Sequence, residues 1–208
     1  VTVAVMPDPP GGETHSEIAD AVRRAGDALA DAGHRVVEAT PPGHETALEL
    51  WADLLIADLT VGRPLLELVL STDAVAVIDA LMARYEAPSL QSSIELHGLR
   101  YRTMRAWSEF FTEHQVLLSP TWALPAFEHD ADLGAGFSGI LSDTLRPVLP
   151  ANVLGLPAAV VPAGLAAGLP VGVQVIGDRF TDLRCLTIAE SIESATGGSV
   201  GPIDPVTS

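Results

Sequence analysis

Residues Pro147–Gly177, PVLPANVLGLPAAVVPAGLAAGLPVGVQVIG, decide the fold of this chain. The stretch carries no charged residue, and its length alone would suit a membrane span. Its five prolines and five glycines exclude a span. Proline removes a backbone donor and clashes inside a helix, and unpaired backbone is not tolerated in lipid. The stretch is therefore expected to form buried strands joined by tight turns.

Two strands are expected inside this stretch. Ala158–Val161 is apolar and β-branched, and Pro162 is expected to end it. Val171–Ile176 alternates, so that its valines share one face. The glycine-containing link between the two predicts a hairpin. Strands that are apolar on both faces belong inside a sheet that helices cover, and we expect the two strands side by side in such an interior.

These segments also resemble a known family. ANVLGLPAAVVPAG (151–164), GLPVGVQVIG (168–177) and the helix start FTDLRCLTIAE (180–190) are similar to the C-terminal core of the amidase signature family. HQVLLSPTWALPAF (114–127) resembles the strand and proline loop that precede this core. The resemblance is densest over Leu117–Ala195. It implies an α/β fold, a mixed β-sheet flanked by helices, and amide hydrolysis by a Ser–cis-Ser–Lys triad without a metal or organic cofactor.

The composition narrows the classes of partner. The net charge of −16 disfavours nucleic acid and anionic membrane surfaces, which attract basic patches. The mean hydropathy is nevertheless positive, at +0.32, and one explanation is that something else covers part of the apolar surface. Cys185 is the single cysteine, so no internal disulfide is expected. No secretory leader pattern follows Val1, and we expect a cytoplasmic protein.

The chain divides into consecutive parts of one amidase-type domain over residues 1–208. A βαβ unit is expected over 1–40, a helical segment over 44–115, the sheet core and a closing helix over 116–196, and a loose tail over 197–208. The start at Val1, without an initiator methionine and directly in a strand, suggests a piece of a longer polypeptide.

Local signals refine the helices. Thr14 and Glu17 fit a capping box at the start of the first helix. Pro64 suits the first turn of a new helix within the helical segment. The closing helix is expected to begin at Thr181 or Asp182, with Leu183, Leu186, Ala189 and Ile192 facing the core.

The catalytic groups of the resembled family are missing from this sequence. It contains no lysine, and its only serine pair, Ser92-Ser93, lies in QSSIEL, which has no glycine and is typical of a helix start. Loss of a serine hydrolase triad costs about a millionfold in turnover. We therefore expect no amidase activity from this segment alone, and we expect its partner to be the missing N-terminal half, which would carry the triad.

Two local motifs are typical of other site types. Gly134–Gly139 matches G-x-G-x-x-G, but no strand precedes it and Ala159 stands where a ribose-binding acid is expected, so a loop is favoured over a nucleotide site. His129 with Asp130 and Asp132 is the only local cluster of metal-ligand types, and a solvated loop is favoured there.

The resemblance implies that four residues line the wall of a substrate pocket: Trp122, Leu124, Asn152 and Gln174. Each has a structural alternative. Trp122 and Leu124 could be loop packing, since pockets and cores share residue types. Asn152 could be a turn or cap residue. A buried Gln174 must form hydrogen bonds, and a backbone partner is favoured over a substrate.

The function expected from the resemblance is that of the C-terminal portion of an amidase, supplying scaffold and pocket wall. The whole enzyme would hydrolyse a small-molecule carboxamide to a carboxylate and ammonia or an amine. Unpaired strand edges on such a portion would favour association with the other half or with itself as a homo-oligomer. The alternative is a non-catalytic binding or regulatory module derived from an amidase.

Overall fold

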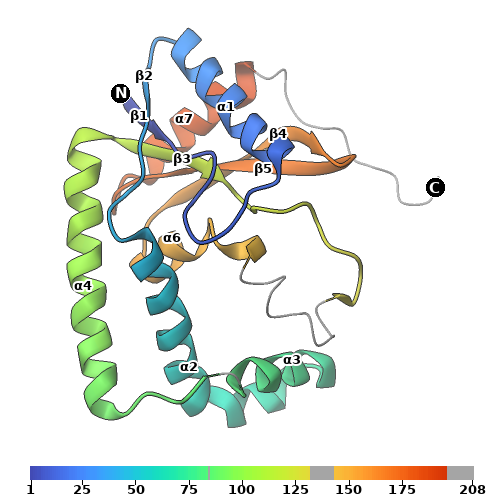
Figure 1. The fold of residues 1–208 in the computed structure, drawn as a ribbon. Helices are drawn as coiled ribbons and strands as arrows, with labels where there is room; N and C mark the ends of the chain where they lie inside the picture. Colours follow the sequence, from blue (N-terminus) through green and yellow to red (C-terminus); the bar gives the residue numbers. More distant parts are fainter. Residues whose placement is uncertain (84, 132–142, 196–208) are drawn as a thin grey trace.

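The computed structural model describes residues 1–83, 85–131 and 143–195 and shows an α/β fold. A five-stranded mixed sheet has the order β2-β1-β3-β5-β4, with helices on both of its faces (Figure 1). The strands are β1 (Thr2–Val5), β2 (Arg35–Glu38), β3 (Val116–Pro120), β4 (Ala158–Ala166) and β5 (Leu169–Ile176). The helices are α1 (Ser16–Asp31), α2 (His44–Val69), α3 (Thr72–Met82), α4 (Leu90–Glu113), α6 (Leu149–Leu154) and α7 (Asp182–Ala195). The predicted Gly134–Gly139 loop, Asp132 and the predicted tail lie outside the described residues.

The strand pairing confirms the βαβ unit and the hairpin. β1 pairs in parallel with β2 and with β3, whereas β5 pairs antiparallel with β3 and β4. The register places Ala158 opposite Ile176 and Ala166 opposite Leu169. The expectation that both hairpin strands lie inside the sheet holds only for β5, because β4 is an outer strand of the described sheet.

Pro162 does not end β4, contrary to the sequence-based expectation. The strand continues to Ala166, with a register shift between Pro162 and Gly164. An outer strand tolerates proline where its missing N–H would face away from the ladder, and a bulge absorbs the irregularity. The hairpin link is reduced to Ala167 and Gly168, which both have positive φ, at 49° and 77°.

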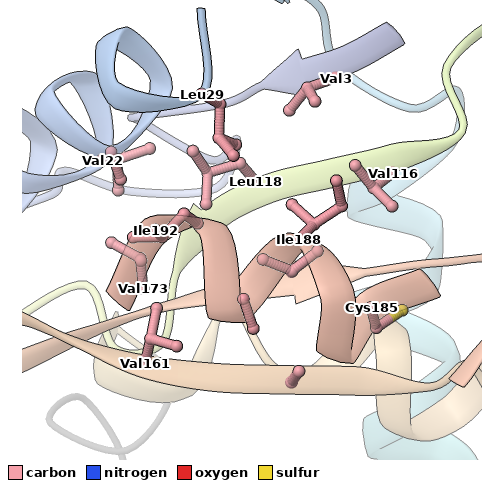
Figure 2. Close-up of a cluster of buried hydrophobic side chains, with 14 of the residues drawn as sticks. Val3, Val22, Leu29, Val116, Leu118, Val161, Val173, Cys185, Ile188 and Ile192 are labelled. Atoms are coloured by element: carbon pink, nitrogen blue, oxygen red, sulfur yellow. The ribbon is translucent and has the colours of Figure 1, made fainter. Parts of the chain in front are cut away.

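Two hydrophobic cores fix the sheet between its helices. Figure 2 shows one of them, in which side chains from α1, α7 and the sheet, such as Val22, Ile192 and Leu118, interdigitate. The other core joins the opposite face to α2, α4 and α6 around Trp107, which is fully buried. Both faces are therefore covered, as the two-sided apolar pattern of Ala158–Ile176 predicts.

Three local helix predictions are wrong. α1 begins at Ser16 without a side-chain cap, and Glu17 Oε2 accepts a hydrogen bond from Ala167 N, 2.6 Å away, in the hairpin link. Pro64 lies inside α2, which is one continuous helix of 26 residues.

The third error concerns two residues of α7; the helix begins at Asp182, and Ala189 and Ile192 are buried, both as expected. Leu183 and Leu186 are 79% and 58% exposed. The buried positions of this helix are Cys185, Ile188, Ala189 and Ile192. The first turns of the helix are apolar on both sides, so periodicity alone did not place Leu183 and Leu186 correctly.

No helix in the described ranges is both long and apolar enough to cross a bilayer. Among the same residues no group of three or more His, Cys, Asp or Glu side chains is arranged to hold a metal ion.

Candidate substrate site

The loop after β3 brings two of the four predicted residues together. Trp122 and Leu124 line a hollow of about 240 Å³ with Val160 and Val171 of the hairpin. Backbone hydrogen bonds hold the loop: Thr121 N donates to Gly172 O, and Ala123 N donates to Thr144 O. The Trp122 ring also stacks on Phe127, with centroids 6.0 Å apart and planes 4° from parallel.

Gln174 lies away from this hollow, on the buried face of β5. It is 2% exposed, and its Nε2 lies 3.1 Å from Ser119 Oγ, 3.0 Å from Pro120 O and 2.8 Å from Pro147 O. These acceptors come from β3 and from the start of the proline-rich stretch. The contacts fit the structural alternative, in which the amide satisfies backbone carbonyls.

Asn152 lies in α6 and faces a second hollow, of about 220 Å³. Its Oδ1 accepts a hydrogen bond of 2.9 Å from Trp51 Nε1 on α2. His97 and Arg100 of α4 line the same hollow. The four predicted residues therefore lie in three separate places.

A third cavity, of about 410 Å³, was not anticipated from the sequence. It lies between α2, α3 and the residues that lead into α6, and Trp51 borders both it and the Asn152 hollow. Its apolar wall consists of Leu48, Trp51, Leu81, Tyr85, Leu145 and Leu149. Its charged lining consists of Glu49, Asp53, Asp143 and Arg146. A volume of this size suits a small-molecule ligand.

Arg146 is the buried polar group of this cavity, at 2% exposure. Its Nη1 donates to Pro9 O at 2.8 Å and its Nη2 to Thr14 Oγ1 at 3.2 Å, while its Nε has no partner. Burial lowers the pKa of Arg146, and the charges of Asp8 and Asp143 act in the opposite direction. The sequence offered one signal for this residue: it is the last charged residue before the uncharged run begins at Pro147.

His44, at the start of α2, is a second buried titratable group near the cavity. It stacks on Trp107 with centroids 6.3 Å apart, and neither ring nitrogen has a hydrogen-bond partner. Burial, aided by the positive charge of Arg146, lowers the pKa of His44 to about 4. The ring is therefore neutral at pH 7.

The described residues offer no activated nucleophile. Ser92 and Ser93 lie in the first turn of α4, where Ser89 Oγ caps the helix by accepting from Ser92 N. Burial raises the pKa of the Cys185 thiol, which favours its unreactive protonated form. The arrangement can bind a small ligand in an apolar cavity, but the groups for covalent catalysis are not among the residues described.

Comparison with known proteins supplies the wider context. A family model described as Amidase matches residues 1–186. Indoleacetamide hydrolases of Bradyrhizobium diazoefficiens and Bradyrhizobium japonicum are each 30% identical to this chain over 200 residues. Both alignments cover 95% of the chain but only 38% and 43% of the relatives. The chain thus spans less than half the length of these curated relatives.

Solved structures share the fold. Fatty acid amide hydrolase superposes with a TM-score of 0.76 at 18% identity, over 95% of this chain and 40% of the other. A bacterial aryl acylamidase of the amidase signature family gives a TM-score of 0.71 at 21% identity, over 94% of this chain and 43% of the other. At these identities the likeness supports the fold alone.

Proposed function

Because the chain belongs to the Amidase (amidase signature) family, we propose that it is the C-terminal portion of an amide hydrolase. The whole protein converts a small-molecule carboxamide and water to a carboxylate and ammonia or an amine. This portion supplies scaffold and one wall of the substrate pocket. The family match over residues 1–186 is the observation that carries the proposal.

The proposal assigns the chemistry to polypeptide outside these residues. The chain has no lysine to serve as base, and its one serine pair forms a helix turn. A serine hydroxyl without an adjacent base is a weak nucleophile at neutral pH. The N-terminal half of the amidase is therefore the proposed partner, and it brings the Ser–cis-Ser–Lys groups to this wall.

Trp122 and Leu124 remain the strongest of the four proposed pocket residues, because they share a hollow. Asn152 acts through Trp51, which it holds by a hydrogen bond at the border of the larger cavity. Gln174 is assigned a supporting role, since its Nε2 already contacts three protein acceptors. The two indoleacetamide hydrolases among the relatives make an arylacetamide the first substrate to test.

The test compares two polypeptides. One is the product of the entire reading frame that contains this sequence, and the other is the 208-residue chain alone. Ammonia release from indole-3-acetamide, phenylacetamide and hexanamide is measured for both. The long product is expected to turn over at least one amide, and the short chain none. Mixing the short chain with the separately expressed remainder is expected to restore turnover.

Two results would contradict the proposal. Turnover by the short chain, reproduced in an independent preparation, would place the catalytic groups within these 208 residues. A reading frame that begins at Val1 and gives a protein without turnover would favour the non-catalytic binding module instead.

The surface of the chain is consistent with such a partner. β4 is an outer strand, and Phe180, Leu183 and Leu186 are exposed near and on α7. Unpaired strand edges and exposed apolar residues favour association. Sedimentation of the short chain is expected to show self-association that the complementary half displaces. A monomer that is indifferent to that half would contradict this part of the proposal.

A further inference from the structure

The cavity of about 410 Å³ combines an apolar wall with one buried cation. Trp51 and Leu149 lie on that wall, and Arg146 is the only positively charged residue among the described residues that line it. An apolar pocket with a few well-placed polar groups is the usual form of a small-molecule site. The chemistry of the cation therefore determines which ligand the cavity selects.

Arg146 is held by neutral acceptors only. Its two observed hydrogen bonds go to a backbone carbonyl and to a threonine hydroxyl, and no ion pair joins it to a carboxylate within the described ranges. A buried charge without an opposite charge in contact is costly, because burial removes its hydration. The unpartnered Nε is a further unmet hydrogen-bonding requirement.

The position of the guanidinium is fixed rather than adaptable. A Cβ added at Gly12 would lie 3.4 Å from both Arg146 Cζ and Nε, and one added at Gly11 would lie 3.2 Å from Arg146 Cδ. The loop backbone thus packs closely over the side chain. A guanidinium held in this way loses little further entropy when an anion binds, which favours a specific site.

The acidic residues of the lining oppose an anion, but more weakly. Glu49 and Asp143 are exposed and Asp53 is half-buried, so water screens their charges. Arg146 is shielded from water, so its charge interacts with an anion through surroundings of lower dielectric constant, where the attraction is stronger. An anion that reaches the buried end is therefore attracted more strongly than the exposed carboxylates repel it.

We propose that this cavity is a carboxylate site: Arg146 pairs with the carboxylate of a small ligand whose aromatic or aliphatic body lies against Trp51 and Leu149. The inference deepens the proposed function and rests on it in one respect. The product of amide hydrolysis at neutral pH is itself a carboxylate, so the acid product is the ligand expected in the cell. The site then retains product, and accumulated acid inhibits the enzyme.

Calorimetric titration of the product of the entire reading frame tests the site without requiring turnover. The probes are acetate, phenylacetate and indole-3-acetate, with phenylacetone as a neutral, non-hydrolysable isostere of phenylacetate. At least one aryl carboxylate is expected to bind, and phenylacetate at least tenfold more tightly than phenylacetone. Equal affinity for the charged and neutral probes, or no binding of any carboxylate, would overturn the proposal.

Two variants and a control identify the residue. Arg146→Met is expected to lose at least tenfold in phenylacetate affinity and to leave that of phenylacetone within about twofold. Arg105→Met, on the exposed face of α4, removes the same charge outside the cavity and is expected to change neither. Glu49→Gln removes an opposing charge and is expected to tighten phenylacetate binding about two- to threefold.

The design keeps the outcomes separate. Arg146 also anchors the loop at Pro9 and Thr14, so Arg146→Met could fail to fold. In that case the probe comparison on the unmodified protein and the Glu49→Gln shift decide the question. Carboxylate binding by the product of the entire reading frame, without any amide turnover by that product, would refute the proposed function and keep this site. Amide turnover without carboxylate binding would support the proposed function and refute this site.

Discussion

The sheet and the helical arm of this molecule use apolar residues in opposite ways. We define the helical arm as residues 57–69 of α2, all of α3, and residues 90–97 of α4. The sheet buries apolar side chains against helices on both of its faces, whereas α3 has no buried residue and lies at the end of α2 away from the sheet (Figure 1). The exposed large apolar residues of the arm are Val61, Leu65, Leu68, Val69, Leu90 and Ile94.

Apolar residues therefore have different roles in the two regions. Within the sheet, burial against neighbours of the same chain stabilises the fold. In the arm, contiguous exposed apolar side chains are typical of a surface that another polypeptide covers. The proposed N-terminal half of the amidase would provide that cover. The comparison predicts different responses to equivalent substitutions in the two regions.

The largest contrast is expected between Trp107 and Leu68. Trp107→Ala removes a fully buried ring that contacts Phe111 and His44, and we expect a loss of about 3–5 kcal/mol in the free energy of unfolding. Leu68→Ala, at a position 80% exposed, is expected to change it by less than about 0.5 kcal/mol. Urea denaturation followed by circular dichroism measures both. Comparable losses would remove the distinction between the two regions.

Acid is expected to weaken the sheet side through His44. Its folded pKa of about 4 lies below the ordinary value of 6.5, so protons bind the unfolded chain first. The contribution of His44 to the free energy of unfolding is fully present above pH 6.5. It is lost as the pH falls toward 4, by about 3 kcal/mol in total. Denaturation midpoints between pH 7.5 and 4.5 are compared for the natural chain and His44→Gln. The variant should lose less stability over this range, and parallel curves would exclude His44 as the cause.

The hydrogen-bonded glutamine in the sheet has a counterpart in the arm. Gln174→Leu leaves buried backbone carbonyls without a donor and is expected to cost about 1–3 kcal/mol. Gln91→Leu, at an exposed site where the amide contacts Glu95, should have an effect below about 0.5 kcal/mol. Thermal unfolding of both variants checks the pair. An equal effect at both sites would mean that the contacts of Gln174 contribute nothing specific.

The smallest expected contrast concerns two glycines, whose substitution by alanine is expected to change stability in opposite directions. Gly177→Ala would place a Cβ against Thr181 Oγ1 and 2.8 Å from Cys185 Sγ, and the crowding is expected to destabilise by about 1–3 kcal/mol. Gly62→Ala meets nothing within 4 Å in the interior of α2 and is expected to stabilise by up to about 1 kcal/mol. Midpoints of thermal unfolding should move in opposite directions. A shift of both in one direction would count against the packing difference.

Much of the sheet could be predicted because its signals are local and strong. The alternation of Val171–Ile176 and the glycines around it predicted the hairpin, and the first forty residues predicted the βαβ unit. The end of β4 and the position of Pro64 could not be predicted in this way. Whether a proline interrupts an element depends on which neighbours need its missing N–H, and that is a tertiary property.

The candidate site was harder to predict because it depends on separations in space. Trp122 and Leu124 are close in sequence and share a hollow, whereas Asn152 and Gln174 follow in the chain but lie elsewhere. Arg146 was missed because its meaning comes from burial and from the acceptors around it. A charged residue next to an uncharged run is a signal, but it does not reveal which partners it meets.

The continuity of α2 through Pro64 has a mechanical consequence. At 1.5 Å per residue the helical path of its 26 residues is about 39 Å long. The helix is buried at His44 and Leu50, borders the cavity with Trp51, and continues into the arm. A partner bound to the arm would therefore contact the same helix, α2, that places Trp51 at the border of the cavity.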